Sequence, residues 1–381
     1  MEHIIENSLF KVVLQKLKEI GAQPLASEKE QTFFEFLKEI LLSLNFNVEW
    51  EIFPALSTYT WPYLVLWGGF IQSALVLQWI PFWSFITSLV LLFLEYWGLS
   101  TFPFLSSLFC RRFSPNLIGK NESTPEFVLL AHVDSAAPSI FFHPRFVTNP
   151  RWSLVFVISS SFAITALAEL RLFVLHPVWQ WVTLLPSLYL FLIAAGHMYQ
   201  EFFMAPSSGG NDNGSGAVVT LEHARLFKEQ SFPFSVVFTG AEESGTWGTL
   251  RLAKKHEDVL HSVPIINLDN LGIGRLTLAT RKGMWKIYNA DVTLLRGLED
   301  AGGGSPFLLC PYFGLSIDAT PLLTRGLSAV TIIALGEKGL PVNWHWHTDT
   351  VDAVDEKNLQ KVAKLLTHFM EERKNESSAK C

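Results

Sequence analysis

One stretch of this chain, residues 209–216, places an acidic side chain among glycines and small polar residues. It reads Gly-Gly-Asn-Asp-Asn-Gly-Ser-Gly, and the carboxylate belongs to Asp212. Glycine permits backbone angles and close approaches that a side chain would block. The stretch can therefore hold Asp212 at a tight strand-to-helix junction before the helix expected at 217–227. Taken alone, such a stretch is more often an ordinary loop closed by an Asx turn.

Four other motifs rich in carboxylates and imidazoles accompany Asp212. They are His132-Val133-Asp134, Glu242-Glu243, Asp269 and a segment at 344–350 that contains two histidines. These residue types are ligands of hard and borderline divalent ions. The set predicts a metal centre, which no single motif would.

The spacing within the motifs indicates what each residue could contribute. His132 and Asp134 are two positions apart in an extended segment, so their side chains face the same way, and a carboxylate can hold a metal-binding imidazole or its backbone surroundings in place. Asp212 has two oxygens and can bridge two metals about 3.5–4 Å apart.

The adjacent carboxylates of Glu242 and Glu243 repel each other unless a cation lies near. With a metal present, one can be a ligand and the other a general base toward an activated water. Asp269 is a further candidate ligand, although an aspartate in its position could instead cap a helix.

The composition narrows the class of protein. A hydrophobic fraction of 49%, a charged fraction of 17% and a mean hydropathy of +0.27 are too apolar for a plain soluble enzyme. The net charge of -6 argues against nucleic acid as a partner. Three widely spaced cysteines (Cys110, Cys310, Cys381) form neither a disulfide framework nor a thiolate metal site, and the charged N-terminus is not a secretory signal. A reducing, cytosol-facing compartment is favoured.

Two pairs of apolar segments interrupt the polar parts of the sequence. Between Glu51 and Arg111 the only charged residue is Glu95. Residues 61–80 and 82–98, and then 152–168 and 172–198, each approach the roughly 20 apolar residues that span a bilayer. The four segments predict two transmembrane hairpins, so that a lipid bilayer is an expected partner; the alternative is a buried pair of core helices in a large soluble protein.

Arginines give an orientation to the predicted hairpins. Arg111, Arg112, Arg145 and Arg151 flank the hairpins on the side of the polar segments, whereas the loops inside the hairpins carry only Arg171. The positive-inside rule then predicts a multi-pass membrane protein of about four spans with a cytoplasmic catalytic domain.

The remaining sequence alternates short apolar runs with helical patterns. Two amphipathic helices are expected in the first 50 residues. Strands are expected at 45–52, 126–131, 235–240, 264–268 and 327–333. Further helices are expected at 250–256, 292–301 and 356–374. This order predicts an α/β fold with a mostly parallel central sheet, helices on both faces and ligands beyond the carboxyl ends of the strands. The predicted catalytic domain comprises residues 1–55, 111–150 and 201–381, and the two hairpins comprise 56–110 and 151–200.

The order of the motifs resembles the two-zinc aminopeptidase family, which includes bacterial leucyl aminopeptidases, glutamate carboxypeptidase-like proteins and glutaminyl cyclases. The resemblance covers everything except the apolar hairpins, which make this chain a membrane-embedded variant. Residues 115–119 also resemble the strand that precedes the metal histidine in that family. The motifs that carry the family resemblance are His132-Val133-Asp134-Ser135, residues 211–216, Glu242-Glu243-Ser244-Gly245, Asn267-Leu268-Asp269, and Trp344-His345 with Asp349-Thr350.

The resemblance implies two Zn²⁺ ions, with Co²⁺ or Mn²⁺ as alternatives, and a role for each residue. Asp212 would bridge the metals, with His132 and Asp269 completing one site. Glu243 and a C-terminal histidine would complete the other. Glu242 would be the general base, and Asp134 would orient His132.

The C-terminal histidine ligand is ambiguous, because two histidines lie close together. His345 stands four positions before Asp349 and follows Trp344, as the ligand often does in the family, so it is the first choice. His347 is the second choice, or a substrate contact. Asp318 lies in a segment that resembles one near the family's site and is expected behind the ligands.

The implied reaction is hydrolysis of an N-terminal residue from a peptide substrate. A single-zinc glutaminyl cyclase is the nearest rival, although residues 242–248 look more like a peptidase. A rival of another class is a membrane scaffold that kept the fold and lost catalysis; such relatives usually lose ligands, whereas every ligand position here is filled. Neither the side-chain preference nor the oligomeric state follows from the sequence.

Overall fold

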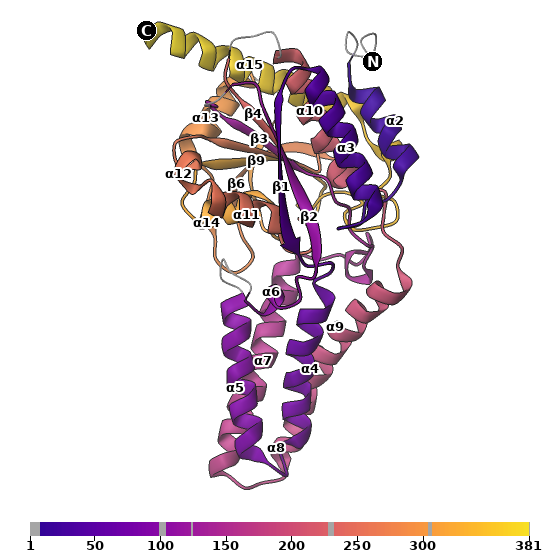
Figure 1. Ribbon diagram of the computed structural model, residues 1–381. Helices are drawn as coiled ribbons and strands as arrows, with labels where there is room; N and C mark the ends of the chain where they lie inside the picture. The colour runs from indigo at the N-terminus through magenta and orange to yellow at the C-terminus, as the bar shows by residue number, and fades with distance from the viewer. Residues whose placement is uncertain (1–7, 99–103, 123–124, 228–231, 304–306, 381) are drawn as a thin grey trace. The chain divides into compact units, whose positions relative to one another are not determined.

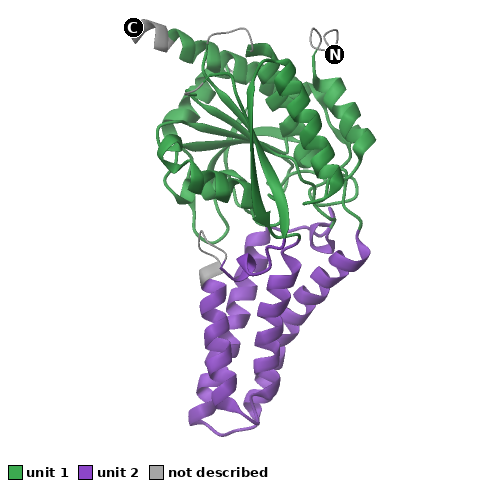
Figure 2. Ribbon diagram, in the orientation of Figure 1, with its two compact units in different colours: residues 1–57, 112–138, 205–381 green, residues 58–111, 139–204 purple. Residues whose placement is uncertain are grey.

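The computed structural model describes residues 8–98, 104–122, 125–227, 232–303 and 307–380. It divides into two compact units, shown in different colours in Figure 2. Unit 1 comprises Met1–Ser57, Arg112–Pro138 and Ala205–Cys381, and unit 2 comprises Thr58–Arg111 and Ser139–Met204. Cys110 and Cys310 are free thiols, and Cys381 lies outside the described residues.

Unit 1 is an α/β unit, and Figure 1 labels many of its helices and strands. Its strands are β1 (Asn47–Ala55), β2 (Arg112–Lys120), β3 (Val128–His132), β4 (Ser235–Thr239), β5 (Ile265–Asp269), β6 (Arg275–Lys282), β7 (Tyr288–Asn289), β8 (Leu308–Tyr312) and β9 (Ala329–Leu335). Its helices are α2 (Phe10–Ile20), α3 (Glu28–Ser43), α10 (Ser215–Phe227), α11 (Trp247–Lys255), α12 (Glu257–Leu260), α13 (Val292–Ala301), α14 (Ala319–Thr324) and α15 (Glu356–Lys380). Two short turns, η2 (Gly210–Gly214) and η3 (Val351–Ala353), complete it.

Local sequence explains where several of these helices begin. The Ser27 hydroxyl accepts a hydrogen bond from the Glu30 amide at 3.1 Å, so it caps α3. The Asp291 carboxylate accepts one from the Leu294 amide at 2.8 Å and caps α13. Each cap satisfies a backbone N–H that has no partner inside the helix, and α13 occupies the residues that its hydrophobic spacing predicts.

The central strands are buried on both faces, as β3, β4, β5 and β9 show over their whole lengths. Alternate residues of one strand enter different cores, because successive side chains point to opposite faces. Leu129 and Ala131 join the larger core with α2, α3, α10, α13 and α15, whereas Val128 and Leu130 join a second core with α11, α12 and α14. Helices therefore cover both faces of the sheet, as predicted.

The nine-stranded sheet has the order β1-β2-β4-β3-β5-β9-β6-β7, with β8 paired to β6. The pairs β3–β4, β3–β5, β5–β9 and β6–β8 are parallel. The pairs β1–β2, β2–β4, β6–β7 and β6–β9 are antiparallel. The predicted mostly parallel sheet is therefore wrong: the sheet is mixed.

The error has a physical cause outside the central parallel strands. The central strands are mostly apolar runs, which is the pattern of parallel strands buried on both faces. In contrast, β6 mixes apolar and polar residues, with Arg275, Thr277 and Arg281 among them, and no strand was predicted there. Its antiparallel pairing with β9 is a non-local choice that its own residues do not signal.

Unit 2 is helical. It contains α4 (Thr60–Val76), α5 (Pro81–Gly98), α6 (Phe104–Ser107), the turn η1 (Ile140–Phe142), α7 (Pro150–Phe173), α8 (Val178–Val182) and α9 (Leu184–Phe203). Its core packs Leu66, Trp67 and Phe70 of α4 against Ile164 of α7 and Leu190 of α9. Many large apolar side chains remain exposed on the outer faces of these helices, among them Trp83, Phe93, Phe162, Leu185 and Phe191.

Two segments of unit 2, Pro150–Phe173 and Val178–Phe203, are long and apolar enough to cross a membrane, and Pro81–Tyr96 is a shorter apolar helix. Only 28% of the apolar stretch in Pro150–Phe173 and 22% of that in Val178–Phe203 is buried inside the structure. Such low burial does not favour the alternative of buried core helices. The expected break at residues 169–171 is wrong, because α7 continues through them to Phe173. The chain turns instead at residues 174–177, before α8.

Candidate metal centre

The predicted ligands meet at one edge of the sheet in unit 1. His132 is the last residue of β3 and Asp269 is the last residue of β5, while Glu242 and Glu243 follow β4. The three strands are neighbours and parallel, with His132 in register with Thr239 at the end of β4. Their carboxyl ends therefore lie together, which is where ligands gather in sheets of this kind.

Asp212 reaches the same place from the turn η2, just before α10. Gly209 has a left-handed φ of 61°, and a Cβ at Gly210 would collide with the backbone of Thr350. Only glycine avoids both penalties, so these two positions explain the glycines of the motif. The peptide bond between Asp212 and Asn213 is cis.

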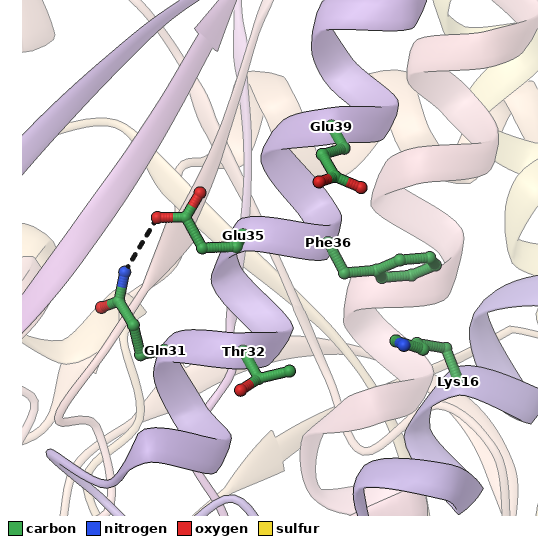
Figure 3. A pocket seen from close by; sticks show the side chains of 6 residues that line it. All are labelled: Lys16, Gln31, Thr32, Glu35, Phe36 and Glu39. Atoms are coloured by element: carbon green, nitrogen blue, oxygen red, sulfur yellow. Dashed lines mark hydrogen bonds between the residues drawn. The ribbon is translucent and has the colours of Figure 1, made fainter.

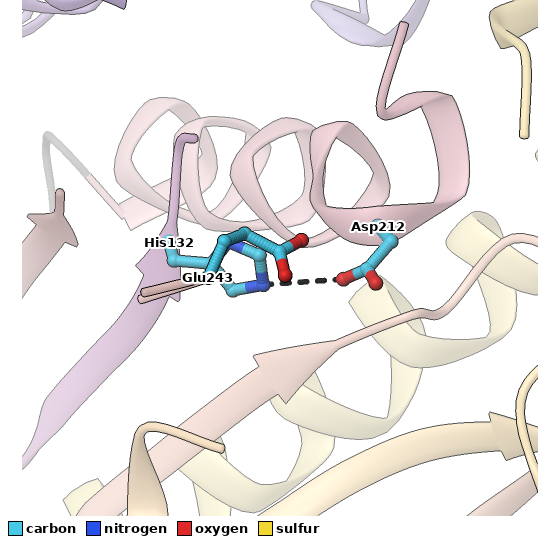
Figure 4. A group of neighbouring side chains, drawn as sticks. All are labelled: His132, Asp212 and Glu243. Atoms are coloured by element: carbon cyan, nitrogen blue, oxygen red, sulfur yellow. Dashed lines mark ion pairs between the residues drawn. The ribbon is translucent and has the colours of Figure 1, made fainter. Parts of the chain in front are cut away.

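Three side chains converge at the centre, as Figure 4 shows. The Nε2 atom of His132 lies 3.2 Å from Oδ1 of Asp212. Candidate ligand atoms of His132, Asp212 and Glu243 all lie within 4.8 Å of one another. This separation suits atoms that share a bound divalent ion, since each would sit about 2 Å from it.

His345 joins the centre and His347 does not. The Nε2 atom of His345 lies 3.4 Å from Oδ2 of Asp212 and 3.0 Å from Oε2 of Glu243. His345 is buried, whereas His347 is exposed. His345 also has a left-handed φ of 48°, which a non-glycine residue seldom adopts. The structure thus brings the first-choice histidine, and not the second, to the other candidates.

Asp134 holds two different parts of the centre. Its main-chain carbonyl accepts a hydrogen bond from Nδ1 of His132 at 3.1 Å, which leaves Nε2 for a metal. Its carboxylate accepts the backbone N–H groups of Glu242 and Glu243, each at 3.0 Å. The nearer contact with His132 is therefore made by the backbone, while Oδ1 of the carboxylate lies 3.8 Å from the same nitrogen and also holds the Glu242-Glu243 turn.

Asp269 and Asp318 are also part of this buried group. Oδ1 of Asp269 lies 4.0 Å from Nε2 of His132 and accepts a hydrogen bond from Asn270 at 2.8 Å. The Asp318 carboxylate accepts hydrogen bonds from the hydroxyls of Thr239 and Thr249. Asp318 is thus tied to the end of β4 and to α11, behind the candidate ligands.

Burial makes the carboxylates of the centre hard to ionise without a cation. Burial raises the pKa of Glu243 to about 7, and the pKa of Asp269 to about 6. The pKa of Glu242 is raised well above its ordinary value for the same reason. Asp212 differs: burial would raise its pKa, but hydrogen bonds from His132 and His345 lower it below its ordinary value.

The two histidines show the opposite shift. Burial alone would lower the pKa of His345, but the charge of Glu243 and its hydrogen bonds with Asp212 and Glu243 raise it to about 10. The pKa of His132 is likewise raised well above its ordinary value, because the carboxylates of Glu242 and Asp212 outweigh burial. Without a metal, protons on these histidines stand in for the positive charge that the carboxylates require.

Buried carboxylate oxygens without hydrogen bonds are a second observation that fits a divalent metal at this centre. Oε1 of Glu242, Oε1 of Glu243 and Oδ2 of Asp269 are buried and have no hydrogen-bond partner among the residues that the structure describes. A buried polar atom without a partner costs free energy. Two imidazoles and several carboxylates with free oxygens are the donor set that zinc accepts.

We expect the metal-free protein to lose stability as the pH rises. Because the pKa values of Glu243 and His345 are raised, to about 7 and about 10, the folded state binds more protons than the unfolded state. The stabilisation from Glu243 is complete below its unfolded pKa near 4.5 and is lost as the pH rises through about 7; that from His345 is complete below about 6.5 and is lost through about 10.

Thermal unfolding of the metal-stripped protein in detergent checks this expectation. The unfolding temperature should fall by several degrees between about pH 5 and about pH 9. Saturating zinc should reverse the trend, because metal binding competes with protons for the same ligands. An unfolding temperature that rises over this range without metal would contradict the assignment.

Three buried residues near the centre had no assigned role in the sequence. Asp349 accepts the backbone N–H groups of Asn211 and Asp212 at 2.7 Å and 3.3 Å, so it fixes the turn that carries Asp212. Burial raises the pKa of Asp349 to about 8, with Asp212 adding to the shift. The position of Asp349 four residues after His345 is the sequence signal that could have indicated its role. Lys282 and Tyr312 lie at the ends of β6 and β8, where no strand was predicted.

A surface hollow between α2 and α3 is a separate feature and not this centre. Figure 3 shows its lining side chains, in which Gln31 donates a hydrogen bond to Glu35 at 3.1 Å. It contains no candidate ligand, and its lining residues are Lys16, Gln31, Thr32, Glu35, Phe36 and Glu39.

Comparisons with known proteins identify a related family model and similar folds. Residues 191–370 match the model of Peptidase family M28. This region contains all the candidate site residues except His132 and Asp134. No curated protein sequence matches the chain.

Several solved structures are similar to this chain over nearly its whole length. The zinc aminopeptidase BSAP from Bacillus subtilis has a TM-score of 0.56 and 14% identity, covering 96% of this chain and 94% of its own. A leucine aminopeptidase precursor from Bacteroides thetaiotaomicron has a TM-score of 0.56 and 15% identity, covering 95% of each chain. The glutaminyl cyclase of Porphyromonas gingivalis has a TM-score of 0.57 and 14% identity, covering 96% and 97%.

At such identities the structural likeness shows the fold, and the family match adds the peptidase signature. The mixed α/β fold with a central sheet is that of zinc aminopeptidases. The resemblance predicted from the motifs is confirmed: residues 191–370 match Peptidase family M28, and solved zinc aminopeptidases share the fold, which together support a zinc-dependent peptidase.

Proposed function

We propose that this chain is a membrane-anchored, metal-dependent aminopeptidase that removes N-terminal residues from peptides. The observation that carries the proposal is the convergence of His132, Asp212, Glu243 and His345 at the carboxyl ends of parallel strands. The unpaired oxygens of Glu242, Glu243 and Asp269 support it further, since they are the groups that a metal and a substrate would use.

Two zinc ions are the proposed cofactors, with Co²⁺ or Mn²⁺ as alternatives. Asp212 would bridge them, because its two oxygens face different histidines, Oδ1 toward His132 and Oδ2 toward His345. His132 and Asp269 would complete one site, and Glu243 and His345 the other. Metal ions held there would supply Lewis acidity toward the scissile carbonyl and lower the pKa of water.

Glu242 is the proposed general base. Its backbone is fixed by the Asp134 carboxylate at 3.0 Å, and its Oε1 atom is buried without a partner. A carboxylate held in this way can take a proton from the attacking water and deliver it to the leaving amine nitrogen. Asp134, Asp349 and Asp318 would keep the ligands and the base in position, through the hydrogen bonds described above.

A single-zinc glutaminyl cyclase is the second candidate, because solved glutaminyl cyclases are as similar to this chain as the aminopeptidases. A mass-spectrometric assay separates the two. Hydrolysis of a leucyl peptide releases a free amino acid, whereas cyclisation of an N-terminal glutamine releases ammonia and leaves the peptide intact. We expect amino acid release and two metals per chain. Cyclisation with one metal bound would favour the glutaminyl cyclase. If neither reaction were detected, the non-catalytic scaffold would be the remaining candidate.

Membrane anchoring by unit 2 is part of the proposal. We interpret the α4–α5 and α7–α9 pairs as two hairpins, with the rest of the chain as a catalytic domain on the cytoplasmic side. The exposed Trp83, Phe93, Phe162 and Phe191 side chains support this reading, since water would not favour such surfaces. The substrate would then be a peptide near the bilayer surface.

Extraction of expressing cells tests the anchor. The protein should remain in the membrane pellet after washing with alkaline carbonate and should be released by a mild detergent. Release of the protein by alkaline carbonate would contradict the predicted membrane-spanning helices. Arg111→Glu with Arg112→Glu, and Arg145→Glu with Arg151→Glu, would test the predicted sidedness, because these charges are the basis for it.

A further inference from the structure

The turn between β4 and α11 directs three consecutive backbone N–H groups at buried carboxyls. The Asp134 carboxylate accepts those of Glu242 and Glu243, each at 3.0 Å. The N–H of the preceding residue, Ala241, hydrogen-bonds instead to the carboxyl of Glu30. Ala241 has a left-handed φ of 58°. A left-handed residue within a run of N–H groups makes a concave site for anions, and here two carboxyls of the protein occupy it.

Glu30 reaches this turn from α3, where only 1% of the residue is exposed. Its Oε1 atom accepts a hydrogen bond from the Ser114 hydroxyl, on β2, at 2.9 Å. Its Oε2 atom accepts one from the Ala26 N–H at 2.6 Å. A Cβ added at Gly240 would lie 3.0 Å from Oε1 of Glu30 and would collide with the Ser114 hydroxyl. The carboxyl is therefore packed directly against the start of the turn.

Helix capping explains only half of these contacts. Ser27 and Glu30 have the spacing of a capping box, in which the glutamate reaches back to a backbone N–H at the start of its own helix. The bond from Ala26 to Oε2 is of that kind. Capping requires neither burial nor a bond to Ser114 on a distant strand, and glutamates are rarely buried unless they are paired. Oε1 of Glu30 therefore has a role outside α3.

The charges around Glu30 show what its burial involves. Burial raises the pKa of Glu30 to about 8, and the charge of Asp134 adds to the shift. Hydrogen bonds from Ser114, Ala26 and the Ala241 backbone oppose it. These donors offset part of the cost of burying a polar group. They come from β2, the start of α3 and the turn, so one carboxyl ties the three segments together.

We propose that Glu30 is a positioning residue that fixes the turn carrying the general base Glu242. The inference rests on the proposed peptidase function, in which Glu242 takes a proton from the attacking water. Asp134 holds the turn at Glu242 and Glu243, and Glu30 holds it one residue earlier, at Ala241. Without Glu30 the backbone can relax at Ala241, which is the residue in the unfavourable conformation. A small displacement of a catalytic group is enough to slow a reaction.

Glu30→Gln tests this role, with Glu28→Gln as the matched control. Glutamine keeps the shape of the side chain but replaces one of the two acceptor oxygens with a donor group. We expect kcat on a leucyl peptide to fall about tenfold, while KM and metal content stay unchanged, because the contacts of Glu30 are with the turn and not with a ligand side chain. Glu28 lies exposed in the first turn of the same helix, so its variant should match the wild type.

A merely structural role would make the loss of activity follow the loss of stability. Ser27→Ala removes the cap of α3, whose hydroxyl accepts the Glu30 N–H at 3.1 Å, and leaves the Glu30 carboxyl in place. This variant should lower the unfolding temperature by a few degrees and leave kcat unchanged. If Ser27→Ala lowered kcat as much as Glu30→Gln, the stability of the helix would explain the loss and the inference would fail.

A double-mutant cycle shows whether Glu30 acts through Glu242. In a Glu242→Gln background the base is already absent, so adding Glu30→Gln should lower the remaining kcat less than about twofold. A further fall of about tenfold in that background would mean that Glu30 acts on another part of the centre, which overturns the inference. Loss of metal from the single Glu30→Gln variant would overturn it for the same reason.

Failure of this inference and failure of the proposed function give different results. Unchanged kcat in Glu30→Gln, beside an active wild type, would overturn the inference and leave the peptidase intact. A wild-type protein that hydrolyses no peptide would refute the proposed function. Amide hydrogen exchange of the detergent-purified protein then tests the restraint itself: exchange at residues 241–243 should be about tenfold faster in Glu30→Gln than in the wild type and in Glu28→Gln. Equal exchange in all three proteins would reject the restraint.

Discussion

Glu242→Gln should lower kcat by about 10²- to 10⁴-fold while the bound metal remains. Glutamine keeps the shape of the side chain and removes the proton acceptor. The turn should survive the change, because its fixed point is the Asp134 carboxylate, which accepts the backbone N–H groups of Glu242 and Glu243 at 3.0 Å. Steady-state hydrolysis of a leucyl peptide, beside metal analysis of the same sample, measures both quantities.

Glu243→Gln is the matched control for this prediction, since the two residues are neighbours and the chemical change is the same. Oε2 of Glu243 lies 3.0 Å from Nε2 of His345, so the control should lose metal as well as activity. If Glu242→Gln lost metal and Glu243→Gln kept it, the two roles would be exchanged. Full activity in Glu242→Gln would mean that another group takes the proton.

Asp212→Ala should abolish metal binding altogether. Asp212 is the carboxylate that both histidines approach, at 3.2 Å from His132 and 3.4 Å from His345. Because a bridging ligand belongs to both metal positions, its loss removes a ligand from each. Metal analysis of the detergent-purified protein should give two ions per chain for the wild type and none for the variant.

Asp352→Ala is the control for Asp212→Ala, because Asp352 is an exposed aspartate whose partner is Lys18, on α2. It should keep both metals. Because removing one partner of a buried ion pair is destabilising, circular dichroism of the Asp212→Ala protein beside the metal-stripped wild type checks that it is folded. One metal retained in Asp212→Ala would show separate sites without a bridge, and two retained would place the metals elsewhere.

The sequence by itself was enough to predict the candidate metal ligands and the resemblance to zinc aminopeptidases. Metal ligands are recognised by residue type, and their order along the chain is visible without any fold. The central strands could be read in the same way, because β3 and β5 are short, mostly apolar runs that are buried over their full length. Helix α13 followed from its spacing, and the structure adds the cap at Asp291. These are local signals, carried by neighbouring residues.

Only the tertiary structure decided the features that depend on distant contacts. It selected His345 over His347, because one histidine is buried against Asp212 and the other faces solvent. It gave the Asp134 carboxylate to the backbone of the Glu242-Glu243 turn, 108 residues away for the first of them. It made the sheet mixed, since β6 pairs with β9 in a direction that neither strand's residues encode.

Lys282 shows the same limit most clearly. Its position in the sequence, at the end of a strand of mixed polarity, gives no sign that the ammonium is buried beside the metal ligands. That environment is created by Tyr312 on a parallel strand and by carboxylates on three other segments of the chain. Residue types are local and can be read along the chain, whereas burial and charge neighbourhoods are sums over the folded molecule.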